Sequence, residues 1–322
     1  MRNFLKKSHF LIFLIWSMFS CNSYKGDRFK TYILPFNVET AELNKLSGKT
    51  ISGSGFMAKW SPDGKYLAYI KEDSKADNPW QLTIQDLKTG EDRKLATDLF
   101  IALSPCWSPD GNSILVVGGP TKRKHTGKNY NGGIYVIDVK TGKTTKSLLF
   151  SDYEFNRPAD ASWPVSDVQW SLDGKSIFFL FYKDRLVKHD LESGKEKVIY
   201  KHSHFNRNIL SRSPDGKSLL FGVYNSKENK SHLYTIPVEG GKEKELCTSQ
   251  KGDQLYCSFW TPDGKYVFFT EDDDGTSLWR VAATGGIPIK VHQTKDRAEF
   301  FSIHPDGKQI SFALNMQFSN EQ

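Results

Sequence analysis

Short apolar segments recur along the chain, each directly after a polar turn. They are five to seven residues long and rich in aromatic and β-branched side chains. Such runs are typical of β-strands that are covered on both faces. The segments are 66–70 (YLAYI), 113–119 (SILVVGG), 176–182 (SIFFLFY), 218–224 (SLLFGVY), 266–270 (YVFFT) and 309–314 (QISFAL).

The turns before these segments share one pattern. Pro presets its own φ, Asp accepts hydrogen bonds from nearby backbone N–H groups, and Gly adopts the left-handed conformation that closes a hairpin. The aspartates are 47, 63, 42, 48 and 43 residues apart, and periods of this size predict a repeat architecture. The turns are SPDGK (61–65), SPDGN (108–112), SLDGK (171–175), SPDGK (213–217), TPDGK (261–265) and HPDGK (304–308).

A second hairpin follows most of the apolar segments. Its first strands are 80–87, 132–139, 185–191, 232–238 and 277–283, and each leads into a glycine turn such as KTGE or ESGK. Each unit therefore has four antiparallel strands. One such sheet cannot bury both of its faces alone, whereas sheets arranged radially cover one another.

The last unit lacks its second hairpin, and the missing piece lies at the other end of the chain. Residues 32–46 (YILPFNVETAELNKL) align with 134–148 (IYVIDVKTGKTTKSL), with Ala41 in place of the turn glycine. The sequence therefore predicts an all-β fold: a six-bladed β-propeller at 31–314, with a closing blade shared by N- and C-terminal strands. A short tail is expected at 315–322.

The repeated W-S-P-D-G-K pattern resembles the TolB-type, WD-repeat-like propeller repeat, over nearly the whole chain after residue 30. Arg212 and Ile303 replace Trp at two of the six equivalent positions, and Leu172 replaces Pro once. The α/β domain that precedes the propeller in TolB does not occur in these residues. The resemblance therefore implies the propeller fold and not the role of TolB itself.

The first 21 residues, MRNFLKKSHFLIFLIWSMFSC, have a basic start, a short apolar run and a terminal cysteine. This order predicts a secretory signal. Its end resembles a lipoprotein lipobox, although Met18 and Phe19 depart from the usual residues, so Cys21 is the expected lipidation site. An uncleaved membrane anchor is the alternative. Residues 22–30 would form a tether, and the absence of an acidic residue after Cys21 favours the outer membrane of a Gram-negative bacterium.

The net charge of +7 becomes +4 without Arg2, Lys6 and Lys7, because 41 basic residues then stand against 37 acidic ones. This mild, interspersed charge gives no indication of nucleic-acid binding. Besides Cys21 the chain has Cys106, Cys247 and Cys257. An odd number argues against a disulfide framework, and whether Cys247 and Cys257 pair stays open.

The candidate binding residues lie on the long loops at one end of the predicted ring, where propellers usually bind ligands. One loop, 118–133, is basic, and another, 149–164, mixes aromatic and charged side chains. Three arginines precede inner strands and can bind carboxylates or phosphates. The alternative is that they pair with local acids such as Asp160, Asp296 and Glu299. The candidates are Lys122, Arg123, Tyr153, Arg157, Trp163, Arg207 and Arg297.

His202 and His204 alternate on an extended segment, so both can face one divalent metal ion. His125 or His292 would supply a third ligand. This stretch is faintly similar to the metal site of some propeller polysaccharide lyases. The alternative is that both are solvated loop histidines.

Three functions follow from these observations. The first is a non-catalytic, membrane-anchored module, without a cofactor, that binds an envelope protein, a peptide or a glycan, as a monomer or within a complex. It is favoured because the chain has no GxSxG, HExxH, CxxC or phosphate-loop motif. The second is a metal-dependent lyase or hydrolase on acidic carbohydrate. The third is a structural spacer in an envelope complex.

Overall fold

The computed structural model describes residues 29–41, 49–51, 55–72, 80–99, 101–119, 132–149, 165–181, 184–206, 209–250 and 255–316. Within these ranges the chain forms strands and no helix.

The strands form six four-stranded antiparallel units, here called blades 1 to 6. Within each blade the strands are given from the innermost to the outermost. Blade 1 is β3 (Gly55–Trp60), β4 (Tyr66–Glu72), β5 (Trp80–Asp86) and β6 (Asp92–Lys94). Blade 2 is β7 (Ile101–Trp107), β8 (Ser113–Gly119), β9 (Gly133–Asp138) and β10 (Thr144–Leu149). Blade 3 is β11 (Val165–Trp170), β12 (Ser176–Phe181), β13 (Arg185–Asp190) and β14 (Glu196–Lys201).

The remaining blades follow the same order. Blade 4 is β15 (Ser211–Arg212), β16 (Ser218–Asn225), β17 (Lys230–Pro237) and β18 (Lys244–Thr248). Blade 5 is β19 (Tyr256–Trp260), β20 (Tyr266–Asp272), β21 (Thr276–Ala282) and β22 (Ile289–Thr294). Blade 6 is β23 (Ala298–Ile303), β24 (Gln309–Asn315), β1 (Phe29–Pro35) and β2 (Lys49–Thr50).

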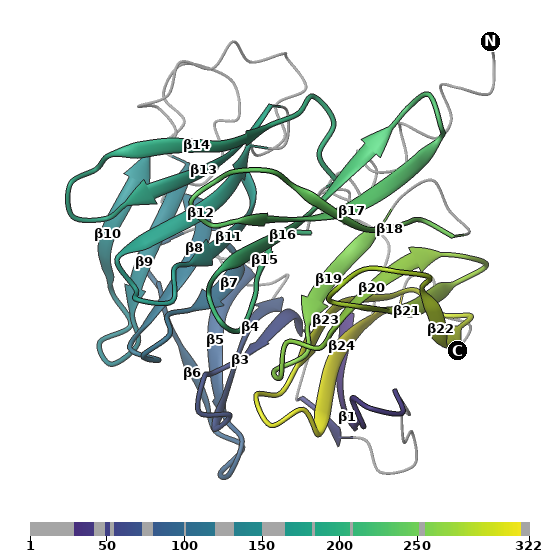
Figure 1. Ribbon diagram of the computed structural model, residues 1–322. Coiled ribbons are helices and arrows are strands. Elements are labelled where there is room, and N and C mark those ends of the chain that lie inside the picture. The colour runs from purple at the N-terminus through teal and green to yellow at the C-terminus, as the bar shows by residue number, and fades with distance from the viewer. Residues whose placement is uncertain are drawn as a thin grey trace, which may run out of the picture.

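The blades are arranged as a closed ring. The inner strands contact one another in the cyclic order β3, β7, β11, β15, β19, β23 and back to β3. Figure 1 shows these strands nearest the centre, with the outer strands toward the rim. Residues Trp80 and Ile101 form one parallel pair that also joins blades 1 and 2 at an edge. The predicted six-bladed β-propeller is confirmed.

Blade 6 combines the two ends of the described chain, as predicted. Strand β1 pairs with β24 along its whole length, from Phe29 opposite Asn315 to Pro35 opposite Gln309. Ala41 has a φ of +58°, and its amide donates to Asn37 O at 2.7 Å. Gly90, Gly142 and Gly194 also have positive φ and donate to the carbonyl four residues earlier, so Ala41 occupies the turn position predicted for it.

The outer strand of blade 6 differs from the alignment. Strand β2 lies at Lys49–Thr50, beyond the stretch that ends at Leu46, and makes two pairs with β1. The amide of Ile51 then donates to Thr31 O at 3.2 Å. Since repeat alignment assumes a fixed turn length, it could not find a strand displaced along the chain.

The core lies between neighbouring blades. Strand β12 is buried at every position, as expected for a strand covered on both faces. Between blades 3 and 4, Phe178 and Leu180 pack with Phe221 and Val223. The apolar segments found in the sequence therefore form the layers that hold adjacent sheets together.

The repeated turns have a shared hydrogen-bond geometry. In blade 1 the Ser61 hydroxyl donates to Asp63 Oδ1 at 2.7 Å and accepts the Tyr66 amide at 2.9 Å. The Asp63 carboxylate accepts the Lys65 amide at 3.1 Å. The turn that begins at Ser171 keeps these bonds although Leu172 replaces Pro. The Ser and Asp side chains, rather than the proline, therefore define the turn.

One of these turns also joins blade 6 to blade 1. Gly64 has a φ of +71°, and a Cβ there would lie 2.3 Å from His304 Nε2. That nitrogen lies 3.2 Å from Gly64 O, and the His304 ring packs edge-on against Trp60, with centroids 4.7 Å apart. Glycine is thus required both for its conformation and for the close approach of the next blade.

Three of the repeated tryptophans bond their blade to the preceding one. Trp60 Nε1 donates to Ser302 O at 3.3 Å, Trp107 Nε1 to Lys59 O at 3.0 Å, and Trp170 Nε1 to Cys106 O at 3.1 Å. The series stops at blade 4, where Arg212 replaces Trp. In blade 5 the Trp260 Nε1 is buried without a partner within the described ranges.

We predict that Trp107→Phe destabilises the protein more than Trp260→Phe. Both changes remove the same atoms, but only the first leaves a bonded carbonyl, Lys59 O, without its donor. The difference in the free energy of unfolding should be about 1–2 kcal/mol. Denaturant unfolding followed by circular dichroism measures it, and equal losses would contradict this role of the indole.

We further predict that replacing the turn aspartates with asparagine makes the free energy of unfolding depend less on pH in acid solution. Hydrogen bonds from Ser61, Ser108, Ser171 and Ser213 hold the pKa values of the following aspartates below 3.8. A carboxyl whose pKa is lower in the folded state stabilises that state above its unfolded pKa, and this contribution disappears as the pH falls through the folded pKa. The aspartates are Asp63, Asp110, Asp173 and Asp215.

The fourfold Asp→Asn variant should therefore lose less unfolding free energy between pH 7 and pH 3 than the natural protein. Urea titrations at the two pH values provide the comparison. An unchanged difference would show that other carboxylates govern acid unfolding.

Candidate functional site

The ring has two unlike faces. The PDG and glycine turns join strands on one side, and the antiparallel order places the other connections on the opposite side, here called the loop face. The structure describes three of the predicted site residues on that face: Arg297, His202 and His204. The others and the lipidation site lie outside the described residues: Cys21, Lys122, Arg123, Tyr153, Arg157, Trp163 and Arg207.

Arg297 precedes inner strand β23 and forms an ion pair with Glu299. Its Nε donates to Glu299 Oε1 at 2.6 Å, and the two side chains are 14% and 15% exposed. The Arg297 carbonyl accepts the Asn315 amide at 3.0 Å. The local pairing that the sequence offered as an alternative to ligand binding is therefore present at this arginine.

His202 and His204 follow strand β14 on the loop face. The His204 amide donates to His202 Nδ1 at 3.1 Å, and Ser203 Oγ lies 2.7 Å from His204 Nδ1. Burial, followed by repulsion from His204, lowers the pKa of His202. The ring centroids are 6.4 Å apart. With both Nδ1 atoms hydrogen-bonded, a metal ion would have to bind through the Nε2 atoms.

A third metal ligand is not found close by in the described part of the chain. There, no three His, Cys, Asp or Glu side chains gather closely enough to hold a metal ion. His292, one of the two ligands considered from the sequence, lies on β22 in blade 5. His125, the other, is outside the described residues.

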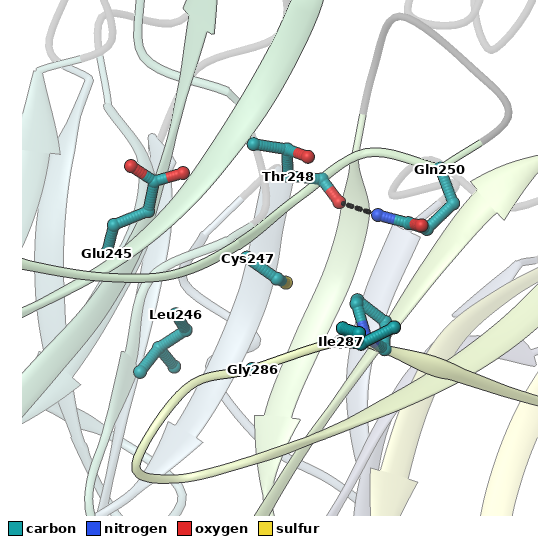
Figure 2. A pocket seen from close by; sticks show the side chains of 8 residues that line it. Glu245, Leu246, Cys247, Thr248, Gln250, Gly286 and Ile287 are labelled. Atoms are coloured by element: carbon teal, nitrogen blue, oxygen red, sulfur yellow. Dashed lines mark hydrogen bonds between the residues drawn. The ribbon is translucent and has the colours of Figure 1, made fainter.

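An open groove lies between blades 4 and 5, where strand β18 meets the turn before β22 (Figure 2). The Gly286 amide fixes that turn to β18 by donating to Leu246 O at 3.0 Å. At one end Gln250 Nε2, in the side chain, donates to Thr248 O at 2.7 Å, the dashed line in Figure 2. The groove has a volume of about 390 Å³ and is lined by Glu245, Leu246, Cys247, Thr248, Gln250, Gly286, Ile287 and Pro288.

The Cys247 thiol points from β18 toward the Ile287 turn in Figure 2. Burial, reinforced by Glu271 and Glu245, raises the pKa of Cys247 to about 12. The thiol is therefore protonated at neutral pH and contributes a small apolar lining rather than a nucleophile. Cys106, Cys247 and Cys257 are all free, so Cys247 and Cys257 do not form a disulfide.

One wall of the groove ends in an exposed apolar lip, formed by Ile287 and Ile289. The two side chains are 89% and 58% exposed. Ile287 lines the groove, and Ile289, two residues later, begins strand β22. The lip lies beside a short turn and not on one of the long loops, so it was not among the sites that the sequence predicted. The available signal was the segment GGIPIK (285–290), with two isoleucines directly after a predicted turn.

No family model matches the chain. It is 28% identical over 234 residues to the uncharacterized peptidase YuxL of Bacillus subtilis, which covers 68% of this chain but 30% of that protein. The chain therefore spans less than a third of the length of this relative. The described residues contain no helix with the length and apolar character of a membrane span.

Solved structures with a similar fold cover most of the chain. A putative TolB from Agrobacterium tumefaciens aligns with a TM-score of 0.64 and 19% identity, over 89% of this chain and 98% of that one. TolB from Acinetobacter baumannii aligns with a TM-score of 0.56 and 19% identity, over 93% of this chain and 67% of that one. An oligogalacturonate lyase in complex with manganese aligns with a TM-score of 0.58 and 14% identity, over 83% of this chain and 79% of that one. The protein has the TolB-like, six-bladed β-propeller fold.

Proposed function

We propose that the protein is a non-catalytic binding module of the bacterial envelope that recognises an extended segment of a protein partner. The observation that carries the proposal is the exposed lip of Ile287 and Ile289 beside the groove. Two large apolar side chains held side by side on a fixed scaffold favour an apolar partner segment. The similarity to TolB structures supports a protein-binding role for the same scaffold.

The groove favours a peptide over a glycan. Its lining includes Leu246, Cys247, Ile287 and Pro288, and Glu245 is already engaged with His232, 3.0 Å from its Nδ1. The exposed Ile287 and Ile289 side chains can bury apolar side chains of a peptide, whereas a sugar packed on them would leave hydroxyl groups without partners.

We propose the location of the protein from its N-terminal sequence. The basic start, apolar run and lipobox-like end of residues 1–21 support export and lipidation at Cys21. Asn22 and Ser23 after the cysteine support the outer membrane. The tether would be residues 22–28, two residues shorter than the sequence predicted, because Phe29 and Lys30 already belong to β1. The propeller would then meet its protein partner close to the membrane surface.

A photo-crosslinking amino acid at position 287 tests the function in intact cell envelopes. We expect it to form a discrete adduct, whereas position 198 should not, because Val198 is 43% exposed on β14 but lies away from the groove. Ile287→Ser with Ile289→Ser should reduce adduct recovery and weaken binding at least tenfold, since each isoleucine contributes about 1.5–3 kcal/mol when fully buried.

Identical adducts at positions 287 and 198, or no adduct at either, would contradict the proposal. The second result would favour a structural spacer. The melting temperature of the double variant serves as the control, because a surface change should leave the fold intact.

A metal-dependent lyase or hydrolase on acidic carbohydrate is the second candidate. The fold similarity to the manganese-bound lyase favours it, together with His202 and His204 on the loop face and the candidate arginines nearby. If the binding-module proposal is correct, the purified protein dialysed against Mn²⁺ should retain far less than one metal ion per chain by mass spectrometry. Stoichiometric metal that His204→Ala removes would favour the enzyme instead.

A further inference from the structure

Cationic side chains close four of the contacts between neighbouring blades, here called seams. They do so on the side of the PDG turns, here called the turn face. In each seam a Lys or Arg of one blade donates to a carbonyl in the second-hairpin turn of the next blade, as Arg93 Nη2 does to Val139 O at 2.6 Å. The pairs are Arg93 with Val139, Lys146 with Leu191, Lys197 with Glu239 and Arg280 with Glu39.

The seam between blades 4 and 5 lacks this contact. Lys244 of β18 has the same place as Lys197 of β14, since each pairs with the residue two before the end of the neighbouring strand. Among the described residues, however, the exposed Lys244 makes no hydrogen bond or ion pair, and Ala283 O in the next turn accepts no side chain. The bond from the Gly286 amide to Leu246 O holds this turn instead. The seam between blades 6 and 1 offers no comparison, because the outer strand of blade 6 is displaced.

The same seam contains buried polar atoms without a partner. In the described part of the chain these include Trp260 Nε1, Trp279 Nε1 and Asn206 Oδ1. Trp279 belongs to the apolar cluster between blades 4 and 5, and Trp260 packs against that cluster. Asn206 reaches the seam because its Nδ2 donates to Leu255 O at 3.4 Å. Buried groups without a partner are costly, so opening the seam to water would recover their hydrogen bonds.

The loop-face side of this seam is held more firmly than the turn-face side. The Gln250 amide donates to Glu271 Oε1 of blade 5 at 2.6 Å, and Glu271 is fully buried. On the turn-face side, Gly286 is exposed and its bond to Leu246 O lies beside the open groove. An opening would therefore pivot near Gln250 and separate the turn of blade 5 from β18.

We propose that the seam between blades 4 and 5 opens from the turn face while the rest of the ring stays closed. Local opening of this kind occurs where exposed backbone hydrogen bonds hold an element. It uncovers Cys247, which is 6% exposed in the closed ring, and deepens the groove beside Ile287. Entry of the partner segment through this opening rests on the proposed function, whereas the opening itself is a property of the free protein.

Labelling of Cys247 with N-ethylmaleimide in the purified full-length protein tests the opening. The closed thiol is buried and protonated, so it reacts when the seam opens. Mass spectrometry of the peptides separates Cys247 from the other cysteines. We expect its opening equilibrium constant to be about tenfold or more above that of the β16 amides, and independent of urea below the unfolding transition. Labelling with the same urea dependence as the β16 amides would overturn the proposal.

Two glycine variants distinguish opening from direct access to the thiol. Gly286 has a φ of +140°, and Gly241 in the corresponding turn of blade 4 has a φ of +134°. Alanine is strained at both positions, but only Gly286 bonds across the seam between blades 4 and 5.

We expect Cys247 labelling to rise about fivefold or more in Gly286→Ala and to stay unchanged in Gly241→Ala. Equal rates in both variants and the natural protein would show that the reagent reaches Cys247 without opening, and would also overturn the proposal. The labelling needs no partner, so this proposal and the crosslinking at position 287 can fail separately.

Discussion

The pairing of β1 with β24 is the constraint on which the other blades depend. Each sheet has two apolar faces and can bury them only against neighbours on both sides. Blades 1 to 5 are built from consecutive strands, but blade 6 exists only when the two ends of the described chain meet. Without it, blades 1 and 5 would each expose one face. Closure therefore completes the core of the whole ring, and not of one blade alone.

Two local interactions align the blades once the ring is closed. The indole bonds join neighbouring inner strands and run from blade 6 through blade 3. The seam between blades 6 and 1 adds the contact of His304 with Gly64 and Trp60. Blade 4 departs from this pattern, since β15 has two residues and carries Arg212 instead of Trp.

The sequence predicted the fold well because the determinants of the blades are local and periodic. A turn of five residues and the apolar strand after it identify each blade without knowledge of any distant contact. Even Ala41 could be placed in a glycine position by alignment, and its positive φ confirms that placement. The displaced strand β2 could not be found in this way, because two residue pairs leave almost no pattern.

The functional surfaces were harder to predict because they depend on contacts between distant residues. Whether Arg297 is available to a ligand depends on Glu299 and on its burial in the assembled blade. The exposure of Ile287 depends on how the turn of blade 5 rests on Leu246 of blade 4. A hydrophobic pattern marks both isoleucines as apolar, but only the assembled ring shows that they face solvent.

Native-state hydrogen exchange measures ring closure most directly, because it compares strands within the intact protein. If blade 6 closes the ring, the β1 amides around Thr31 and Ile33 should exchange only through global unfolding, with the same opening free energy and denaturant dependence as those of β16. Exchange of β1 at a much lower, denaturant-independent opening free energy, while β16 stays protected, would show that the N-terminal strand frays freely and would contradict the account.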